Sequence, residues 1–113
     1  MAEIRAESRY LYIGPQKLRL VIDKVRGLNA RQALTVLNFM PQKGAKFAHK
    51  LIESAIANAE NNRDMDGDRL FVSEIFAGEG PRLKRFKAGA RGRYKPRVKR
   101  TAHLTVILAE REG

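Results

Sequence analysis

The fold is decided by the stretch from Gly80 to Ala109, which reads GPRLKRFKAGARGRYKPRVKRTAHLTVILA. It contains no Asp or Glu, and its ten basic residues are Arg82, Lys84, Arg85, Lys87, Arg91, Arg93, Lys95, Arg97, Lys99 and Arg100. The whole chain has 23 basic and 12 acidic residues and a net charge of +11, so 13 basic and all 12 acidic residues lie elsewhere. We therefore expect a nearly neutral domain with one cationic appendage, whose charge favours a polyanionic partner.

Two apolar segments flank the basic stretch and predict a pair of strands. Leu70–Phe76 and Leu104–Ala109 are rich in Phe, Val, Ile, Leu and Thr, which is typical of strands. If Ser73 lies opposite Val106 in an antiparallel pair, the midpoint of the connection falls within the Gly-containing segment 88–92. Glycine reaches the positive φ that a tight reversal needs, so this segment is the predicted turn of a hairpin.

This reasoning predicts one domain over residues 1–113, from which residues 80–102 protrude as a basic β-hairpin. Pro96 is compatible with a ribbon because proline is tolerated where one edge of a strand faces outward. Phe86 and Tyr94 lie among the charges, and aromatic rings can stack on exposed bases. The alternative is a solvated basic loop without regular structure.

The N-terminal part predicts a strand over residues 3–13 and a helix that opens at Pro15 and stops at Gly27. The apolar face of this helix has helical spacing and consists of Leu18, Val21, Ile22 and Val25. The basic residues largely off that face are Lys17, Arg19, Lys24 and Arg26. They are either a solvated polar face or a surface that contacts phosphate.

Two further helices are predicted before the second strand. One starts at Asn29, where Gln32 three residues later resembles a capping box, and Pro41 closes it. A short link of residues 42–44 then precedes the longest helix, which ends at Asn61-Asn62. Its apolar stripe, rich in alanine, predicts close packing against a neighbour and consists of Ala45, Ala48, Ile52, Ala55, Ile56 and Ala59.

The sequence offers little support for a metal site, a cofactor or catalysis. Asp64, Asp66 and Asp68 match three positions of a calcium loop, but the required Gly and Glu of that loop are absent. Residues 78–81 predict a turn, since no phosphate-loop motif follows them. Neither His49 nor His103 has a nucleophile or a carboxylate pair near it in the sequence. We expect no enzyme, no metal and no cofactor; a small nuclease using His103 is the weakest alternative.

Length and composition set the remaining bounds. A chain of 113 residues suffices for one compact core, and the absence of Cys excludes disulfides and thiolate metal sites. No apolar run approaches the roughly 20 residues needed to cross a bilayer. The charged N-terminus is unlike a signal peptide, so we expect a cytoplasmic protein without membrane contact.

Several separated motifs, in order, resemble those of the bacterial form of large-subunit ribosomal protein family twenty-two. They are Pro15-Gln16-Lys17-Leu18-Arg19-Leu20-Val21 with Arg26-Gly27, Glu53-Ser54-Ala55-Ile56-Ala57-Asn58-Ala59-Glu60-Asn61, Glu79-Gly80-Pro81, Lys84-Arg85, Ala90-Arg91-Gly92-Arg93, and Lys99-Arg100-Thr101-Ala102-His103-Leu104-Thr105-Val106. The chain departs from the family pattern in having Gly14 before the helix-opening proline and Ala88-Gly89 at the hairpin tip.

The resemblance implies an α+β fold in which three helices pack on a small three-stranded antiparallel sheet and a long basic β-hairpin extends from it. It implies a structural constituent of the large subunit that binds ribosomal RNA, contacts neighbouring subunit proteins and acts as a monomer within the ribosome. By this resemblance the hairpin tip lines the nascent-peptide exit tunnel and consists of Ala88, Gly89, Ala90, Arg91, Gly92 and Arg93. The RNA contacts come from Lys17, Arg19 and the ten basic residues of the arm.

The alternative function is that of an architectural DNA-binding protein, in which basic β-arms embrace the minor groove. It shares the basic arm but normally requires a dimerisation face, and the predicted helices offer no surplus apolar stripe for one.

Overall fold

The computed structural model describes the backbone of residues 3–80, 83–88, 94–99 and 101–111, and the side chains of residues 3–80 and 101–111. In chain order its elements are β1 (Glu3–Leu11), α1 (Pro15–Ile22), α2 (Ala30–Asn38), α3 (Lys43–Arg63), the 3₁₀ turn η1 (Gly67–Arg69), β2 (Leu70–Glu79), β3 (Leu83–Ala88), β4 (Tyr94–Lys99) and β5 (Ala102–Glu110).

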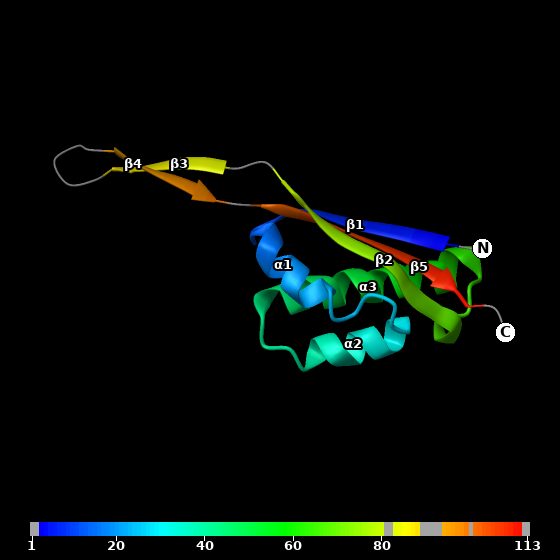
Figure 1. The fold of residues 1–113 in the computed structure, drawn as a ribbon. Helices are drawn as coiled ribbons and strands as arrows, with labels where there is room; N and C mark the ends of the chain where they lie inside the picture. Colours follow the sequence, from blue (N-terminus) through cyan, green and yellow to red (C-terminus); the bar gives the residue numbers. More distant parts are fainter. Residues whose placement is uncertain (1–2, 81–82, 89–93, 100, 112–113) are drawn as a thin grey trace.

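Three strands form an antiparallel sheet in the order β1-β5-β2, so the last strand of the chain lies at its centre. Leu108 pairs with Ile4 on one side and with Val72 on the other. Figure 1 shows all three helices on one face of this sheet, with α3 running beneath the strands. The α+β class, with three helices on a three-stranded antiparallel sheet, is thereby confirmed.

The core lies between the sheet and the helices. Every second residue of β5 points into it, and Leu104, Val106 and Leu108 are fully buried. Ile22 of α1 and Ile52 of α3 are also fully buried. The alanines of the α3 stripe are at most 1% exposed, which confirms that they mark a close approach between elements; they are Ala45, Ala48, Ala55 and Ala59.

Local signals explain where the helices begin and end. The side-chain oxygen of Asn29 accepts hydrogen bonds from the backbone N–H groups of Arg31 and Gln32, at 3.0 and 3.4 Å, and so caps α2. The first helix ends at Ile22, earlier than predicted, and turns carry the chain to Gly27. Gly27 has φ +84, a conformation that favours glycine, and it reverses the chain toward β2.

The predicted pairing of Ser73 with Val106 is wrong. Val106 lies opposite Ile75, and the register shifts between Val72 and Glu74, so that Ser73 forms a bulge. Matching the centres of two apolar segments cannot detect a bulge, because it adds one residue to one strand only. The error also arises because β2 continues to Glu79, beyond its apolar segment.

The predicted turn at residues 78–81 is also wrong in its first half, since Gly78 pairs with His103 and Glu79 with Ala102. Gly78 belongs to β2, and Gly80 directly follows the end of this strand. A Cβ atom on Gly80 would lie 2.5 Å from the hydroxyl oxygen of Thr101, so glycine is required there by close approach of the two strands.

Strands β3 and β4 pair antiparallel, from Leu83 opposite Lys99 to Ala88 opposite Tyr94, as a separate two-stranded sheet. Figure 1 shows them beyond the ends of β2 and β5. Pro96 lies within β4, as a ribbon permits. The proposed hairpin of residues 80–102 includes residues outside the described part, so its extent as a protruding unit stays a prediction.

The buried contact of α3 with the sheet predicts the effect of truncating Ile52. We expect Ile52→Ala to lower the free energy of unfolding by about 2–5 kcal/mol, because it leaves a cavity beneath β5. Leu20 is 72% exposed, and Leu20→Ala should change stability by less than ~0.5 kcal/mol. Urea denaturation of both variants measures the difference, and equal losses would contradict this placement of the core.

Candidate nucleic-acid interface

Most of the predicted RNA-binding residues belong to the basic arm, whose side chains lie outside the described part of the structure. These are Arg82, Lys84, Arg85, Lys87, Arg91, Arg93, Lys95, Arg97, Lys99 and Arg100. Of the predicted tip, Ala88 ends β3 and residues 89–93 lie outside the described residues. Lys17 and Arg19 are the two predicted contacts whose side chains are described.

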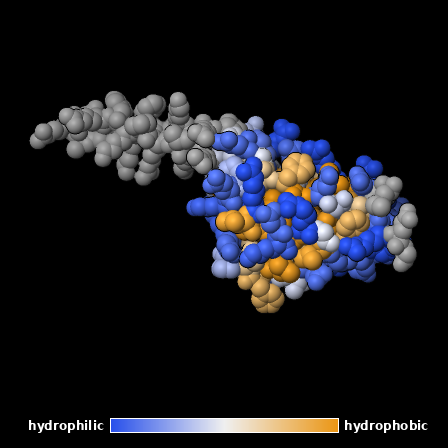
Figure 2. All heavy atoms as spheres, in the orientation of Figure 1, coloured by the Kyte–Doolittle hydropathy of each residue, from blue (hydrophilic) through white to orange (hydrophobic). Residues whose placement is uncertain are grey.

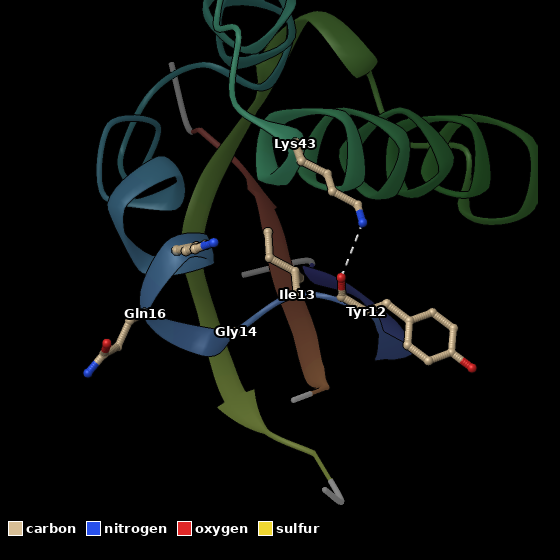
Figure 3. A pocket seen from close by; sticks show the side chains of 6 residues that line it. Tyr12, Ile13, Gly14, Gln16 and Lys43 are labelled. Carbon is tan, nitrogen blue, oxygen red and sulfur yellow. Dashed lines mark hydrogen bonds between the residues drawn. The ribbon is translucent and has the colours of Figure 1, made fainter. Parts of the chain in front are cut away.

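Lys17 is exposed and borders an open hollow of about 420 Å³ at the start of α1. The hollow is lined by Tyr12, Ile13, Gly14, Gln16, Lys17 and Lys43 (Figure 3). Its two ammonium groups come from different helices, and no carboxylate lines it. A concave surface with this lining suits a phosphate better than a cation.

Lys43 is a residue of this hollow that the sequence reasoning missed. The sequence predicts Lys43 in the link before the longest helix, whereas Lys43 is the first residue of α3. Its ammonium group donates a 3.3 Å hydrogen bond to the backbone carbonyl of Tyr12 (Figure 3). The same group lies 5.8 Å from the centre of the Phe47 ring. These contacts hold the cation at the junction of β1, α1 and α3.

Arg19 and Arg26 have a structural role that neither predicted alternative included. Arg19 Nη2 donates to the carbonyl of Ala77 at 3.0 Å, and Arg26 Nη2 donates to that of Ile75 at 2.7 Å. Arg26 Nη1 also donates to Asp23 Oδ1 at 2.7 Å. Both arginines therefore satisfy carbonyls on the outer edge of β2, which would otherwise be open to another strand.

The described charges are unevenly distributed. Four lysines form no salt bridge with any described residue. They are Lys17 on α1, Lys24 on the turn after it, and Lys46 and Lys50 on the first half of α3. Figure 1 places α1 and the start of α3 at the end of the body nearest β3 and β4. Lysines without an internal salt bridge among the described residues therefore lie on the elements at this end of the body.

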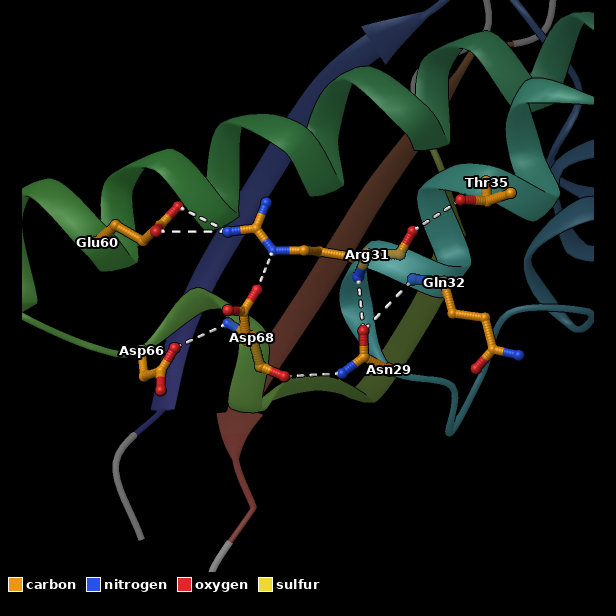
Figure 4. Close-up of polar contacts among 7 residues, drawn as sticks. All are labelled: Asn29, Arg31, Gln32, Thr35, Glu60, Asp66 and Asp68. Carbon is orange, nitrogen blue, oxygen red and sulfur yellow. Dashed lines mark hydrogen bonds and ion pairs between the residues drawn. The ribbon is translucent and has the colours of Figure 1, made fainter.

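The acidic turn lies at the opposite end of the body, where one arginine pairs with two carboxylates. Arg31 Nε contacts Asp68 Oδ1 at 2.8 Å, and Arg31 Nη2 lies 3.4 Å from Glu60 Oε1 (Figure 4). Asp66 accepts a 3.0 Å hydrogen bond from the backbone N–H of Asp68. These contacts give Asp66 and Asp68, two aspartates of the rejected calcium motif, a structural role in the turn that positions η1.

Other features of the described residues add no catalytic or metal site. No group of three or more His, Cys, Asp or Glu side chains in the described ranges is arranged to hold a metal ion. The Nδ1 atom of His103 accepts a 3.2 Å hydrogen bond from the backbone N–H of Tyr10, and the two rings meet edge to face. His103 therefore joins β5 to the end of β1.

Comparison with known proteins decides the family. The family described as ribosomal protein L22p/L17e matches residues 6–109. The chain belongs to this family. A relative from Thermomicrobium roseum, named large ribosomal subunit protein uL22, is 53% identical over 108 residues, which are 96% of this chain and 92% of the relative. Relatives of the same name from Caldicellulosiruptor saccharolyticus and Thermus thermophilus are 50% and 48% identical.

These relatives match the chain along most of its length. The match covers 95% of this chain and 88% of the Caldicellulosiruptor saccharolyticus protein, and 98% of both chains for Thermus thermophilus. The L22p/L17e match includes the whole basic arm as well as the body. The resemblance stated from the motifs is therefore confirmed.

The surface of the body is mixed rather than uniformly polar. Figure 2 shows hydrophilic side chains over much of this view, with apolar patches among them over the helical layer. In the part of the chain whose side chains are described, the large apolar side chains that are more than half exposed are Tyr10, Tyr12, Leu20 and Phe39. Among the described residues, no helix combines the length and apolarity required to span a membrane.

The contacts of Arg26 predict a separation of structural and binding roles. Arg26→Lys keeps the charge but loses the planar fork that bonds Asp23 and Ile75, so we expect stability to fall by about 1 kcal/mol. Lys17→Ala should leave stability within ~0.5 kcal/mol and weaken RNA binding. Thermal unfolding and an RNA titration of each variant measure the two effects. A stable Arg26→Lys protein with impaired RNA binding would contradict the structural role.

Proposed function

We infer that the chain is a structural, non-catalytic constituent of the large ribosomal subunit, located in the cytoplasmic ribosome. The observation that carries this inference is the match of residues 6–109 to the L22p/L17e family, together with relatives named large ribosomal subunit protein uL22 that align along most of their length. The family has a structural role, so the chain works by binding and positioning rather than by turnover.

The chemistry of the chain supports ribosomal RNA as its main ligand. Ten basic residues and no acidic ones lie between Gly80 and Ala109, and the exposed lysines of α1 and α3 extend this charge onto the body. Arginine presents a planar fork of donors to phosphate, and lysine presents a compact point charge.

The same reasoning orders the two nucleic-acid alternatives. Both RNA and DNA would attract the basic arm through their phosphates, so charge alone does not separate them. Ribosomal relatives favour RNA over the architectural DNA-binding alternative. Competition between duplex DNA and ribosomal RNA at equal salt tests the choice, and stronger retention of the DNA would reverse it.

We propose that the body is a monomer within the ribosome and contacts neighbouring subunit proteins. We also propose that the tip of the arm lines the nascent-peptide exit tunnel. Support for the tip comes from family membership and from the pairing of Ala88 with Tyr94, which leaves residues 89–93 to connect the strands. A photo-reactive residue in place of Gly89, in ribosomes stalled during synthesis, tests this. Cross-links to the nascent peptide are expected, and cross-links to RNA alone would contradict the proposal.

Salt dependence tests the role of the basic arm in RNA binding. We expect replacement of Arg91, Arg93 and Lys95 by Ala to weaken binding to large-subunit RNA and to flatten the slope of log affinity against log salt by about one for each lost phosphate contact. Arg63→Ala is the control, because Arg63 is exposed at the far end of α3. A slope that is unchanged in the triple variant, or equally reduced in the control, would exclude the arm as the main contact.

A further inference from the structure

A second concave surface lies between β1 and the first half of α3, on the side of the sheet away from β2. It forms a groove of about 330 Å³. Its apolar lining consists of Ala6 and Leu11 from β1 and Phe47 and Leu51 from α3. Leu51 is buried, while the other three are partly exposed and pack against the core, so the floor of the groove is apolar and supported from below.

The groove runs beside an open edge of the sheet. β1 pairs with β5 on one side, and among the described residues no backbone hydrogen bond reaches its other side. The opposite edge of the sheet is covered: Gly27 N–H donates to the Val72 carbonyl, Val72 N–H donates to the Leu28 carbonyl, and Arg26 binds Ile75. One edge strand is therefore closed by this chain's own residues and the other is available to an added strand.

Polar residues at the rim of the groove indicate what would fit. Lys50 is exposed at the rim and forms no salt bridge with any described residue, so it offers an ammonium group to an incoming carboxylate. Glu7 also lines the groove and pairs with Arg9 at 3.1 Å. Arg9 thus offsets the charge of Glu7, and Lys50 is left to attract a carboxylate. An RNA backbone, with a phosphate at every nucleotide, would meet an apolar floor here, which disfavours RNA.

We propose that this β1–α3 groove binds an extended, acidic segment of another protein. The segment adds to the free edge of β1 as an outer strand and forms main-chain hydrogen bonds with it. Every second side chain of such a strand faces the helices, so an apolar residue lies over Phe47 and Leu51. A carboxylate beside it pairs with Lys50. This binding surface is separate from the basic arm and does not depend on RNA.

A titration of the full-length, isotope-labelled protein tests the groove. The probe is a blocked peptide matched to the nine residues of β1, with Val or Ile at alternate positions and Asp, Glu or Thr between them. We expect saturable shifts of the backbone amides of residues 4–11 and 47–54, and slower hydrogen exchange of the β1 amides. The same peptide with Lys in place of each acidic residue should bind about tenfold more weakly.

Two variants and one control complete the test. Lys50→Glu should lower the affinity for the acidic peptide about tenfold by replacing attraction with repulsion. Phe47→Ala should lower it by removing the apolar wall, whereas Lys24→Glu, at an exposed lysine outside the groove, should leave it unchanged. Absence of saturable shifts at millimolar peptide would overturn the proposal. Equal effects of the two lysine variants, or preferential occupation of the groove by a single-stranded RNA oligonucleotide, would also overturn it.

Discussion

The antiparallel pairing of β5 with both β1 and β2 joins the two ends of the chain and gives the helices a surface on which to pack. β5 is the last strand in sequence and the central strand in space. Its inward residues Leu104, Val106 and Leu108 are fully buried beneath the helices. Because β2 and β5 lie side by side, the segment that connects them must leave the body at their common end, where Figure 1 shows β3 and β4.

The two edges of the sheet differ: side chains of α1 and the following turn cover the edge at β2, whereas a groove lies beside the edge at β1. Arg19 and Arg26 use guanidinium N–H groups to bond the carbonyls of Ala77 and Ile75, which fixes α1 against β2. The edge of β1 has no such cover among the described residues, and a groove lies beside it. Lysines on α1 and α3 form no ion pair with another described residue, whereas Arg31 at the far end is held by Asp68 and Glu60.

Much of the fold was predictable because burial imposes a period on the sequence. The burial of the stripe from Leu18 to Val25, the alanines of α3 and the Asn29 cap were identified correctly, since each depends on neighbours close in the chain. The end of the first helix was placed too late, because the chain leaves the helix after Ile22 while Val25 stays buried. The register of β2 was not predictable, because the bulge at Ser73 is set by pairing across the sheet. The contacts of Arg26 and Lys43 were missed for a similar reason. Their partners, Ile75 and Tyr12, are brought near only by the tertiary fold.

The body folds around β5 and is nearly neutral, and the segment connected to it is rich in Lys and Arg. This distribution of charge favours a polyanionic partner, and the family places the chain in the large ribosomal subunit. Sedimentation of a lysate from cells that produce the tagged full chain tests this most directly. The chain should travel with the large-subunit particles and should move to the top of the gradient after ribonuclease treatment. A chain found at the top of the gradient before treatment would contradict the account.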